Sequence, residues 1–210
     1  MVHEVKPRVV YWLDKSLYLN ITNKCSNNCW FCFRNFKKGV GGFNLKLEKE
    51  PAIEEVKVGL QNVLALRCWR ELVFCGFGEP TARLDVLLQI TRWIRNQYND
   101  NIRIRIDTNG HGYKLNEGRD VARELRDVRV DRVSISLNGH DEASYAENCR
   151  PVFGGGFAVV LDFIKRAKSA GLDVDISALR MPEVNIEKVR AISESLGVTL
   201  RIRDYLPVCW

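Results

Sequence analysis

The residues that offer the most chemistry in this sequence are three cysteines in the run NKCSNNCWFC, namely Cys25, Cys29 and Cys32. Their spacing is C-x3-C-x2-C, and they follow an apolar, strand-like stretch at residues 17–21. Thiolates are the soft ligands that iron-sulfur clusters select, so three of them on one loop can hold a single cluster. Three thiolates leave one iron of a [4Fe-4S] cluster without a protein ligand, and such an open position can bind a small molecule.

A structural zinc site is the alternative interpretation of these cysteines. Zinc sites pair two thiolates with a second pair or with histidines further along the chain, and no fourth ligand at such spacing follows Cys32. The spacing therefore favours a cluster over zinc or incidental cysteines. Among the other cysteines, Cys68, Cys75 and Cys149 lie in apolar or strand-like surroundings and are interpreted as small buried side chains. Cys209 receives no assignment.

The composition favours one cytoplasmic domain. The chain has 210 residues, 46% of them hydrophobic, which is enough for one core and too few for two ordinary domains. Residues 1–15 lack the apolar core of a signal peptide, and no run approaches the length of a membrane span. Seven cysteines without a targeting signal indicate a reducing compartment. The net charge of +6 is interpreted as an ordinary solvated surface, with non-specific nucleic-acid contact as the alternative.

Periodicity predicts six strand-helix units around the cysteine loop. Short apolar runs predict strands at residues 17–22, 71–75, 102–107, 132–137, 173–179 and 199–203. Amphipathic stretches predict helices at residues 52–66, 84–96, 118–126, 157–170 and 186–196. Gly171 and Gly197 are predicted C-terminal caps, and residues 145–156 a flexible linker. This alternation predicts an α/β fold, an open partial (β/α)6 TIM-like barrel with parallel strands, because six units cannot close an eight-stranded barrel.

Strand parity predicts which polar side chains face the interior. Alternate residues of a strand share a face, so the polar face should line the lumen while the isoleucines pack on helices. The polar residues are Arg103, Arg105, Asp107 and Asn109 near one strand and Ser134, Ser136 and Asn138 near the next. The last three either bond the backbone at a strand end or contact a cofactor. In α/β architectures the ligand lies at the carboxyl ends of the strands, where these residues fall.

A second motif, Gly76-Phe-Gly-Glu-Pro80, ends the strand predicted at residues 71–75. Its glycines permit close backbone approach, and the carboxylate of Glu79 can accept hydrogen bonds from an ammonium group. The alternative is a simple strand-to-helix turn with Pro80 near the helix start.

Five further residues are candidates for substrate contact. The histidines follow strand ends and serve either as acid, base or ligand or as solvated loop side chains. The arginines near strand ends favour a carboxylate or phosphate on the substrate if they converge. These candidates are His111, His140, Arg105, Arg180 and Arg203.

Together these motifs resemble the radical S-adenosylmethionine (SAM) superfamily. The superfamily signature is C-x3-C-x-aromatic-C, and here Phe31 is the aromatic residue before the last cysteine. The resemblance continues in order through ELVFCGFGEP (71–80), IRIDTNG (104–110) and VSISLNG (133–139), so it covers roughly residues 17–206. Four sequence segments are most similar to those of the small group named for its association with TatD-family nucleases. They are FCGFGEP, RIDTNGHG, SISLNGHD and YAENCRP.

The resemblance implies an enzyme with a [4Fe-4S] cluster on Cys25, Cys29 and Cys32. It implies that the reduced cluster cleaves SAM to methionine and a 5′-deoxyadenosyl radical, which abstracts hydrogen from an unknown substrate. The Glu79 motif resembles the family's GGEP motif, which holds the SAM amino group, with Phe77 between the glycines. The residues that we assign to SAM contacts are Phe31, Gly76, Phe77, Gly78, Glu79, Asp107, Asn109, Ser136 and Asn138.

The expected partners are a one-electron reductant such as flavodoxin or ferredoxin and a TatD-family nuclease. We also expect either a macromolecular substrate or a homodimer to close the cavity. Two alternatives stay open. The first is another enzyme of the superfamily, either a glycyl-radical activase or a 7-carboxy-7-deazaguanine-synthase-like enzyme. The second is a non-enzymatic iron-sulfur or zinc protein that partners a nuclease. We predict one radical SAM domain over residues 1–210, with an extension at 1–16, a core at 17–206 and a tail at 207–210.

Overall fold

The computed structural model describes residues 6–205 and is built around one seven-stranded sheet. Its strands, in sheet order, are β1 (Val10–Leu13), β2 (Ser16–Leu19), β5 (Glu71–Phe74), β6 (Arg103–Thr108), β7 (Arg132–Ser136), β8 (Asp173–Arg180) and β9 (Thr199–Asp204). The last six run parallel, and β1 pairs antiparallel with β2. The strands have the same order in the sheet as in the chain. Right-handed crossovers between adjacent parallel strands produce this order.

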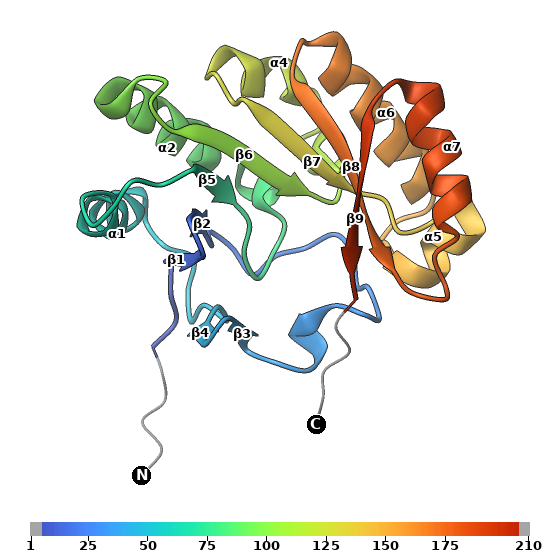
Figure 1. The fold of residues 1–210 in the computed structure, drawn as a ribbon, viewed down its shortest axis with the longest axis horizontal. Helices are drawn as coiled ribbons and strands as arrows, with labels where there is room; N and C mark the ends of the chain where they lie inside the picture. The colour runs from blue at the N-terminus through green and yellow to red at the C-terminus, as the bar shows by residue number, and fades with distance from the viewer. Residues whose placement is uncertain (1–5, 206–210) are drawn as a thin grey trace.

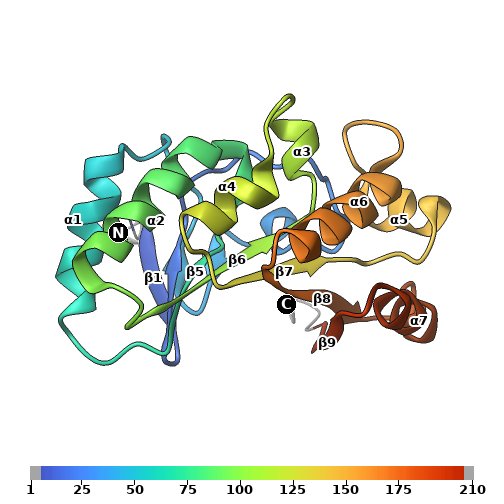
Figure 2. The ribbon, with the colours of Figure 1, turned by 90° about the horizontal axis from the view of Figure 1, so that it is seen from above.

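Helices connect the parallel strands and form a layer outside them. They are α1 (Ile53–Leu64), α2 (Leu84–Tyr98), α3 (Gly112–Leu115), α4 (Val121–Asp127), α5 (Glu142–Cys149), α6 (Gly156–Ser169) and α7 (Ile186–Leu196). Short 3-10 turns lie at η1 (Phe33–Asn35) and η2 (Pro80–Arg83), and a small hairpin joins β3 (Gly39–Val40) to β4 (Phe43–Asn44). The longer helices follow one another in an arc along the outside of the curved sheet (Figure 1), and α1, α2, α4 and α6 lie together on one side of it (Figure 2).

This architecture confirms the predicted α/β fold with an open partial barrel. Within residues 6–205, β1 and β9 are the two edges of the sheet, so the barrel does not close. Six predicted strands and five predicted helices are present, although their ends shift by a few residues. The predicted caps are also confirmed, because Gly171 and Gly197 have φ values of 79° and 61°, in the left-handed region that glycine tolerates.

Two segments differ from the sequence prediction. The sheet begins at Val10, inside the segment assigned to an extension, because Asp14 (φ 50°) and Lys15 make a tight turn that pairs β1 with β2. Residues 145–149 are not a flexible linker but the end of α5, which begins with a capping box in which the Asp141 carboxylate accepts from Ser144 N at 2.8 Å. The predicted tail at 207–210 lies outside the described residues.

The core confirms the parity argument for β6. Ile104 and Ile106 are fully buried in the hydrophobic core, which includes the inner faces of the helices. Arg105 and Asp107 lie on the opposite face, where the Arg105 guanidinium is 3.5 Å from the Asp107 carboxylate. The strand therefore separates a dry outer layer from a polar interior, and the polar interior opens at the carboxyl ends of the strands.

Candidate active site

The cysteine loop lies at the carboxyl end of β2 and is fixed by side chains at its first turn. Asn23 is bonded in both directions to Leu47, donating to its carbonyl at 2.7 Å and accepting from its backbone N–H at 3.1 Å. Glu79 N donates to Lys24 O at 2.7 Å, so the second motif is bonded directly to the residue before Cys25. The loop and the Gly-Phe-Gly-Glu motif are thus one hydrogen-bonded unit.

A cavity with two adjoining lobes lies beside this loop. One lobe of about 170 Å³ is polar and lined by Cys25 and Cys32, the second motif, strand-end residues and two arginines of β9. The other lobe, of about 330 Å³, is lined by Cys29, Phe31, Cys32 and residues near the end of β9. The residues common to both lobes are Cys32, Phe33, Ser136 and Arg203. All three predicted cluster ligands therefore border one continuous site.

Glu79 is the most strongly bonded side chain at the site. It is 3% exposed. Its Oε1 accepts from Thr81 N (3.0 Å), Thr81 Oγ1 (2.7 Å) and Thr108 Oγ1 (2.7 Å), and its Oε2 accepts from Asn109 N at 2.7 Å. Burial raises the pKa of Glu79, while these hydrogen bonds act in the opposite direction. The carboxylate borders the polar lobe in a fixed orientation, as a group that receives an ammonium requires.

Asn109 connects the β6 end to the cysteine loop. Its Nδ2 lies 2.9 Å from Ser26 Oγ and 3.8 Å from Cys25 Sγ, and its Oδ1 accepts from His111 N at 3.0 Å. Asn109, a predicted SAM contact, lines the polar lobe. Its amide donors, however, point to the loop, so Asn109 also orients Cys25.

The remaining predicted SAM contacts divide into two groups. Those that border the cavity are Phe31 in the larger lobe, Gly76, Phe77, Gly78, Glu79, Asp107 and Asn109 in the polar lobe, and Ser136 in both. Asn138 is not among the lining residues of either lobe. Its Oδ1 accepts from Leu179 N at 2.8 Å and its carbonyl accepts from Asn148 Nδ2 at 2.9 Å, so it bonds neighbouring segments, one of the two roles anticipated for it.

The glycines of the second motif are required by close contacts. A Cβ on Gly76 would lie 2.7 Å from the Asn20 backbone, and one on Gly78 would lie 2.4 Å from the Lys24 carbonyl. Phe77, which interrupts the two glycines, packs edge-to-face on Phe33 and lies under the Arg34 guanidinium at 5.7 Å. The extra aromatic residue therefore packs against the segment that follows the last cysteine of the loop.

His111 is fully buried between the cysteine loop and α5, and it is not a solvated loop residue. Its Nδ1 lies 2.9 Å from Ser26 Oγ and its Nε2 lies 3.0 Å from Tyr145 OH. It lines neither lobe of the cavity, so it supports the cysteine loop on the side away from the cavity. His140 lies apart from the cavity, with its Nε2 at 3.2 Å from Lys188 Nζ and 3.3 Å from Asp141.

The buried His111 predicts a pH-dependent stability. Burial lowers the pKa of His111 to about 4, whereas an unfolded histidine has its ordinary pKa of about 6.5. Because the unfolded chain then binds the proton more readily, the free energy of unfolding should fall as pH decreases from about 6.5 to about 4, by up to ~3 kcal/mol. Urea unfolding across this range checks the slope.

The matched variant for this measurement is His111→Gln, which keeps polar contacts but does not titrate. Its stability should be lower overall and should depend less on pH between about 4 and 6.5 than that of the wild type. Parallel pH profiles for the two proteins would show that other groups cause the dependence.

Of the three arginines that were expected to contact the substrate if they converge, Arg180 lies apart from the site. Arg180 is turned outward, 66% exposed and paired with Asp204 at 3.0 Å, so it lies away from the cavity lining. Arg105 is held by Glu71 and Asp107 at 3.3 and 3.5 Å. These carboxylates leave Arg105 on the inner face of the sheet, below the site rather than on its lining.

The arginines of β9 are the ones that line the polar lobe. Arg203 donates from Nε to Ser177 Oγ at 2.7 Å. Arg201, which sequence analysis missed, donates to Ser134 Oγ at 3.0 Å and lies 3.8 Å from Asp175. The signal was available, because residues two apart on a strand share a face.

The thiols fit an iron-sulfur cluster by chemistry. In this conformation, among residues 6–205, no three Cys, His, Asp or Glu side chains are gathered as a metal-binding group. Cys29 is instead hydrogen-bonded to Cys149, and that contact with burial raises the pKa of the Cys29 thiol. Burial also raises the pKa of Cys25 to about 11, so both are neutral thiols here. Three soft donors on one cavity suit a cluster once they are deprotonated.

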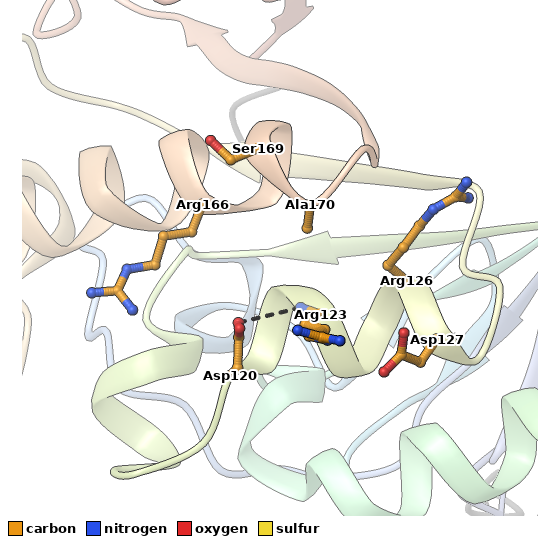
Figure 3. Close-up of a pocket in the computed structure, with 7 residues that line it drawn as sticks. All are labelled: Asp120, Arg123, Arg126, Asp127, Arg166, Ser169 and Ala170. Carbon is orange, nitrogen blue, oxygen red and sulfur yellow. Dashed lines mark hydrogen bonds between the residues drawn. The ribbon is translucent and has the colours of Figure 1, made fainter.

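A second hollow, of about 490 Å³, lies on the outside of the helical layer (Figure 3). It is formed between α4 and α6, and its residues are Asp120, Arg123, Arg126, Asp127, Arg166, Ser169 and Ala170. It contains none of the cysteines or strand-end residues. We therefore place the chemistry at the two-lobed cavity.

Comparisons with known proteins decide the family. The family model described as "Radical SAM superfamily" matches residues 19–196, which is most of the chain. The chain belongs to the radical SAM superfamily. The Streptococcus suis protein SuiB bound to S-adenosylmethionine has the same core fold, with a TM-score of 0.71 at 15% identity over 92% of this chain and 41% of SuiB. The structure titled "Native anSMEcpe with bound AdoMet" gives 0.69 at 18% identity, over 90% of this chain and 50% of that one.

Curated relatives carry a more specific name. A "Probable GTP 3′,8-cyclase" of Methanococcus aeolicus is 28% identical over 92% of this chain and 60% of its own length. A "GTP 3′,8-cyclase" of Nitrobacter winogradskyi is 25% identical over 91% of this chain and 53% of its own. This chain therefore spans about half to three fifths of these relatives, whose name does not support the predicted TatD-associated group.

The radical SAM superfamily is a family of enzymes that use a [4Fe-4S] cluster and SAM, so membership supports both cofactors for this chain. Membership also favours an enzyme over the non-enzymatic alternative considered from the sequence. Within residues 6–205, the structure contains no helix long and apolar enough to cross a membrane.

Proposed function

We propose that Cys25, Cys29 and Cys32 hold the [4Fe-4S] cluster and that the neighbouring polar lobe holds SAM. The single observation that carries this proposal is that all three thiols border one cavity, together with the Gly-Phe-Gly-Glu motif. When bound, the cluster and SAM supply a one-electron cleavage whose radical product removes a hydrogen atom from the substrate.

The chain's own residues bind and orient the reactants. Glu79 is held by two backbone N–H groups and two threonine hydroxyls, and its Oε2, with one donor, can accept a further bond from an ammonium group. Gly76 and Gly78 allow the backbone to approach without a side chain. Ser136 offers a hydroxyl at the junction of the two lobes.

We further propose that the substrate carries a carboxylate or phosphate group that contacts Arg203. Arg105 and Arg201 each have a carboxylate within 4.0 Å, whereas Arg203 forms no ion pair among the described residues and bonds a neutral serine hydroxyl. Arg203 also borders both lobes, so its guanidinium can bind an oxyanion beside the SAM site. The relatives' name supports a phosphate, because GTP is a nucleoside triphosphate.

GTP is accordingly the first compound to test, and an anaerobic assay of 5′-deoxyadenosine with SAM and dithionite is the readout. GTP should increase nucleoside formation by the reconstituted enzyme, and Arg203→Gln should lower kcat/KM for GTP by about tenfold to a hundredfold, the effect of losing a charged hydrogen bond. SAM cleavage without GTP should change little.

The matched control is Arg180→Gln, which removes a guanidinium from the next strand outside the cavity. Its kcat/KM for GTP should equal that of the wild type. If GTP has no effect, a panel of carboxylates and phosphorylated nucleosides replaces it. Equal kinetics for wild type and Arg203→Gln with an active substrate would disprove the role of Arg203.

Other aspects of function stay predictions. They are a single domain, an association with a TatD-family nuclease, a flavodoxin or ferredoxin reductant, and a macromolecular substrate or homodimer. A glycyl-radical activase or 7-carboxy-7-deazaguanine-synthase-like activity also stays open within the superfamily, and the substrate panel distinguishes these from GTP chemistry.

A further inference from the structure

Residues 26–30 of the cysteine loop dock on the C-terminal end of α5 and the residues that follow it. Asn28 N donates to Cys149 O at 3.1 Å and to Arg150 O at 3.0 Å, and Asn27 forms a β-bridge with Pro151. Val152 N donates to the carbonyl of the residue after Cys25, at 3.0 Å. Backbone contacts therefore fix the distance between this part of the loop and the last turn of α5.

Side chains reinforce the same contact. Trp30 donates from Nε1 to Asn148 Oδ1 at 3.2 Å, and Asn27 donates from Nδ2 to Tyr145 OH at 3.1 Å. Trp30 and Cys29 also pack against the core that includes Cys149. The two segments are 118 residues apart in the sequence at each of these side-chain contacts, so only the fold brings them together.

Two thiols meet in this interface. Cys149, the last residue of α5, is 2% exposed, and its carbonyl accepts from the backbone N–H of Asn28, the residue before Cys29, at 3.1 Å. The side chains of Cys29 and Cys149 are in contact. Cys25 is instead within reach of Asn109. Cys68 is exposed, so the prediction that it is a buried side chain was wrong. A pair of sulfur atoms on two segments held by backbone hydrogen bonds meets the main demand of a disulfide, which is close and fixed backbone positions.

We propose that Cys29 and Cys149 form a redox-modification site that operates when the cluster is absent. Hydrogen peroxide is the oxidant in this reaction: one thiol attacks it and becomes a sulfenic acid, with release of one water. The second thiol then displaces the hydroxyl group as a second water and forms the S–S bond. Two thiols and one peroxide thus give one disulfide and two waters.

The disulfide removes one of the three proposed cluster ligands. Oxidised protein cannot offer Cys29 as a thiolate, so it should not assemble the cluster until a reductant restores the thiols. This consequence rests on the proposed function, whereas the cross-link itself does not. Cys149 is buried, so access of peroxide to the pair is restricted and the reaction is followed over hours.

The test uses full-length protein purified without cluster and treated anaerobically with hydrogen peroxide. Non-reducing peptide mapping by mass spectrometry should find a peptide linking Cys29 to Cys149, with the loss of two hydrogens, and dithiothreitol should reverse it. This measurement needs neither iron nor activity. Absence of the linked peptide, or linkage of Cys29 to another cysteine, would overturn the proposal.

A second arm measures iron content after peroxide, removal of peroxide and reconstitution without thiol reductant. Wild-type protein should bind about tenfold less iron than untreated protein, and Cys149→Ala should retain most of its capacity. Cys149→Ser is the alternative if alanine leaves a poorly folded protein, and Cys68→Ala is the control that should behave as wild type. If peroxide lowers iron binding equally in Cys149→Ala and in the wild type, the disulfide between Cys29 and Cys149 is not what blocks cluster assembly, and that part of the proposal is wrong.

The two arms separate this inference from the proposed function. A linked peptide with unchanged iron binding would leave the redox site standing and would count against Cys29 as a cluster ligand. Loss of iron binding without a linked peptide would count against the redox site alone.

Discussion

Cys32→Ala is expected to abolish both cluster assembly and formation of 5′-deoxyadenosine. Cys32 is the one of the three cysteines that borders both lobes of the cavity. Removing one of three ligands leaves two thiolates, and a [4Fe-4S] cluster is then not retained. Iron and sulfide content, visible absorbance and anaerobic chromatography of the nucleoside measure the effect, which should be at least about a hundredfold on SAM cleavage.

The control for this experiment is Cys68→Ala. Cys68 is an exposed free thiol outside the site, so the variant should bind iron and cleave SAM as the wild type does. Retention of a [4Fe-4S] spectrum and of nucleoside formation by Cys32→Ala would refute the proposed ligand set. Stoichiometric zinc in place of iron, for the wild type, would refute the cluster itself.

Glu79→Gln is expected to reduce stability and SAM cleavage together. The carboxylate accepts four hydrogen bonds from N–H and O–H donors, and a glutamine amide would direct its own N–H groups at some of those donors. Leaving buried donors without an acceptor should lower the free energy of unfolding by about 2–4 kcal/mol. The same change should disturb the contact between Asn109 and the cysteine loop, since Asn109 N is one of the donors.

Urea unfolding of the protein without cluster measures the stability, and nucleoside formation measures the catalytic effect. Glu117→Gln is the matched control, because Glu117 is a surface residue paired with Lys114 and 75% exposed. Solvent screens a surface pair of this kind, so the control should unfold nearly as the wild type does. Equal stability of Glu79→Gln and wild type would show that the four hydrogen bonds have little net value.

Local sequence signals determined the order of elements and the position of the cysteine loop. The spacing of hydrophobic residues and the positions of glycines at helix ends are properties of short segments. The six parallel strands and the caps at Gly171 and Gly197 could therefore be predicted without tertiary contacts. The capping box at Asp141 and Ser144 was equally local, and α5 was missed because the glycine-rich run after it was given more weight.

Strand parity predicted part of the site as well. It correctly placed the polar residues of β6 on the inner face, and the same rule, applied to β9, would have found Arg201 beside Arg203. Strand parity does not predict where the side chain of Arg180 lies. It lies near the carboxyl end of β8 as expected, yet an ion pair with Asp204 on the neighbouring strand holds its side chain outside the cavity.

The sequence alone thus determined the family, the sheet order and the segments that carry the chemistry, because those depend on residue types at short spacing. Only the tertiary structure decided which side chains meet. His111 contacts Ser26, 85 positions before it, and Tyr145, 34 positions after it. Cys29 contacts Cys149, more than 100 positions after it. Such pairings depend on how α5 packs against the loop, and side-chain packing of that kind has no local period that a sequence displays.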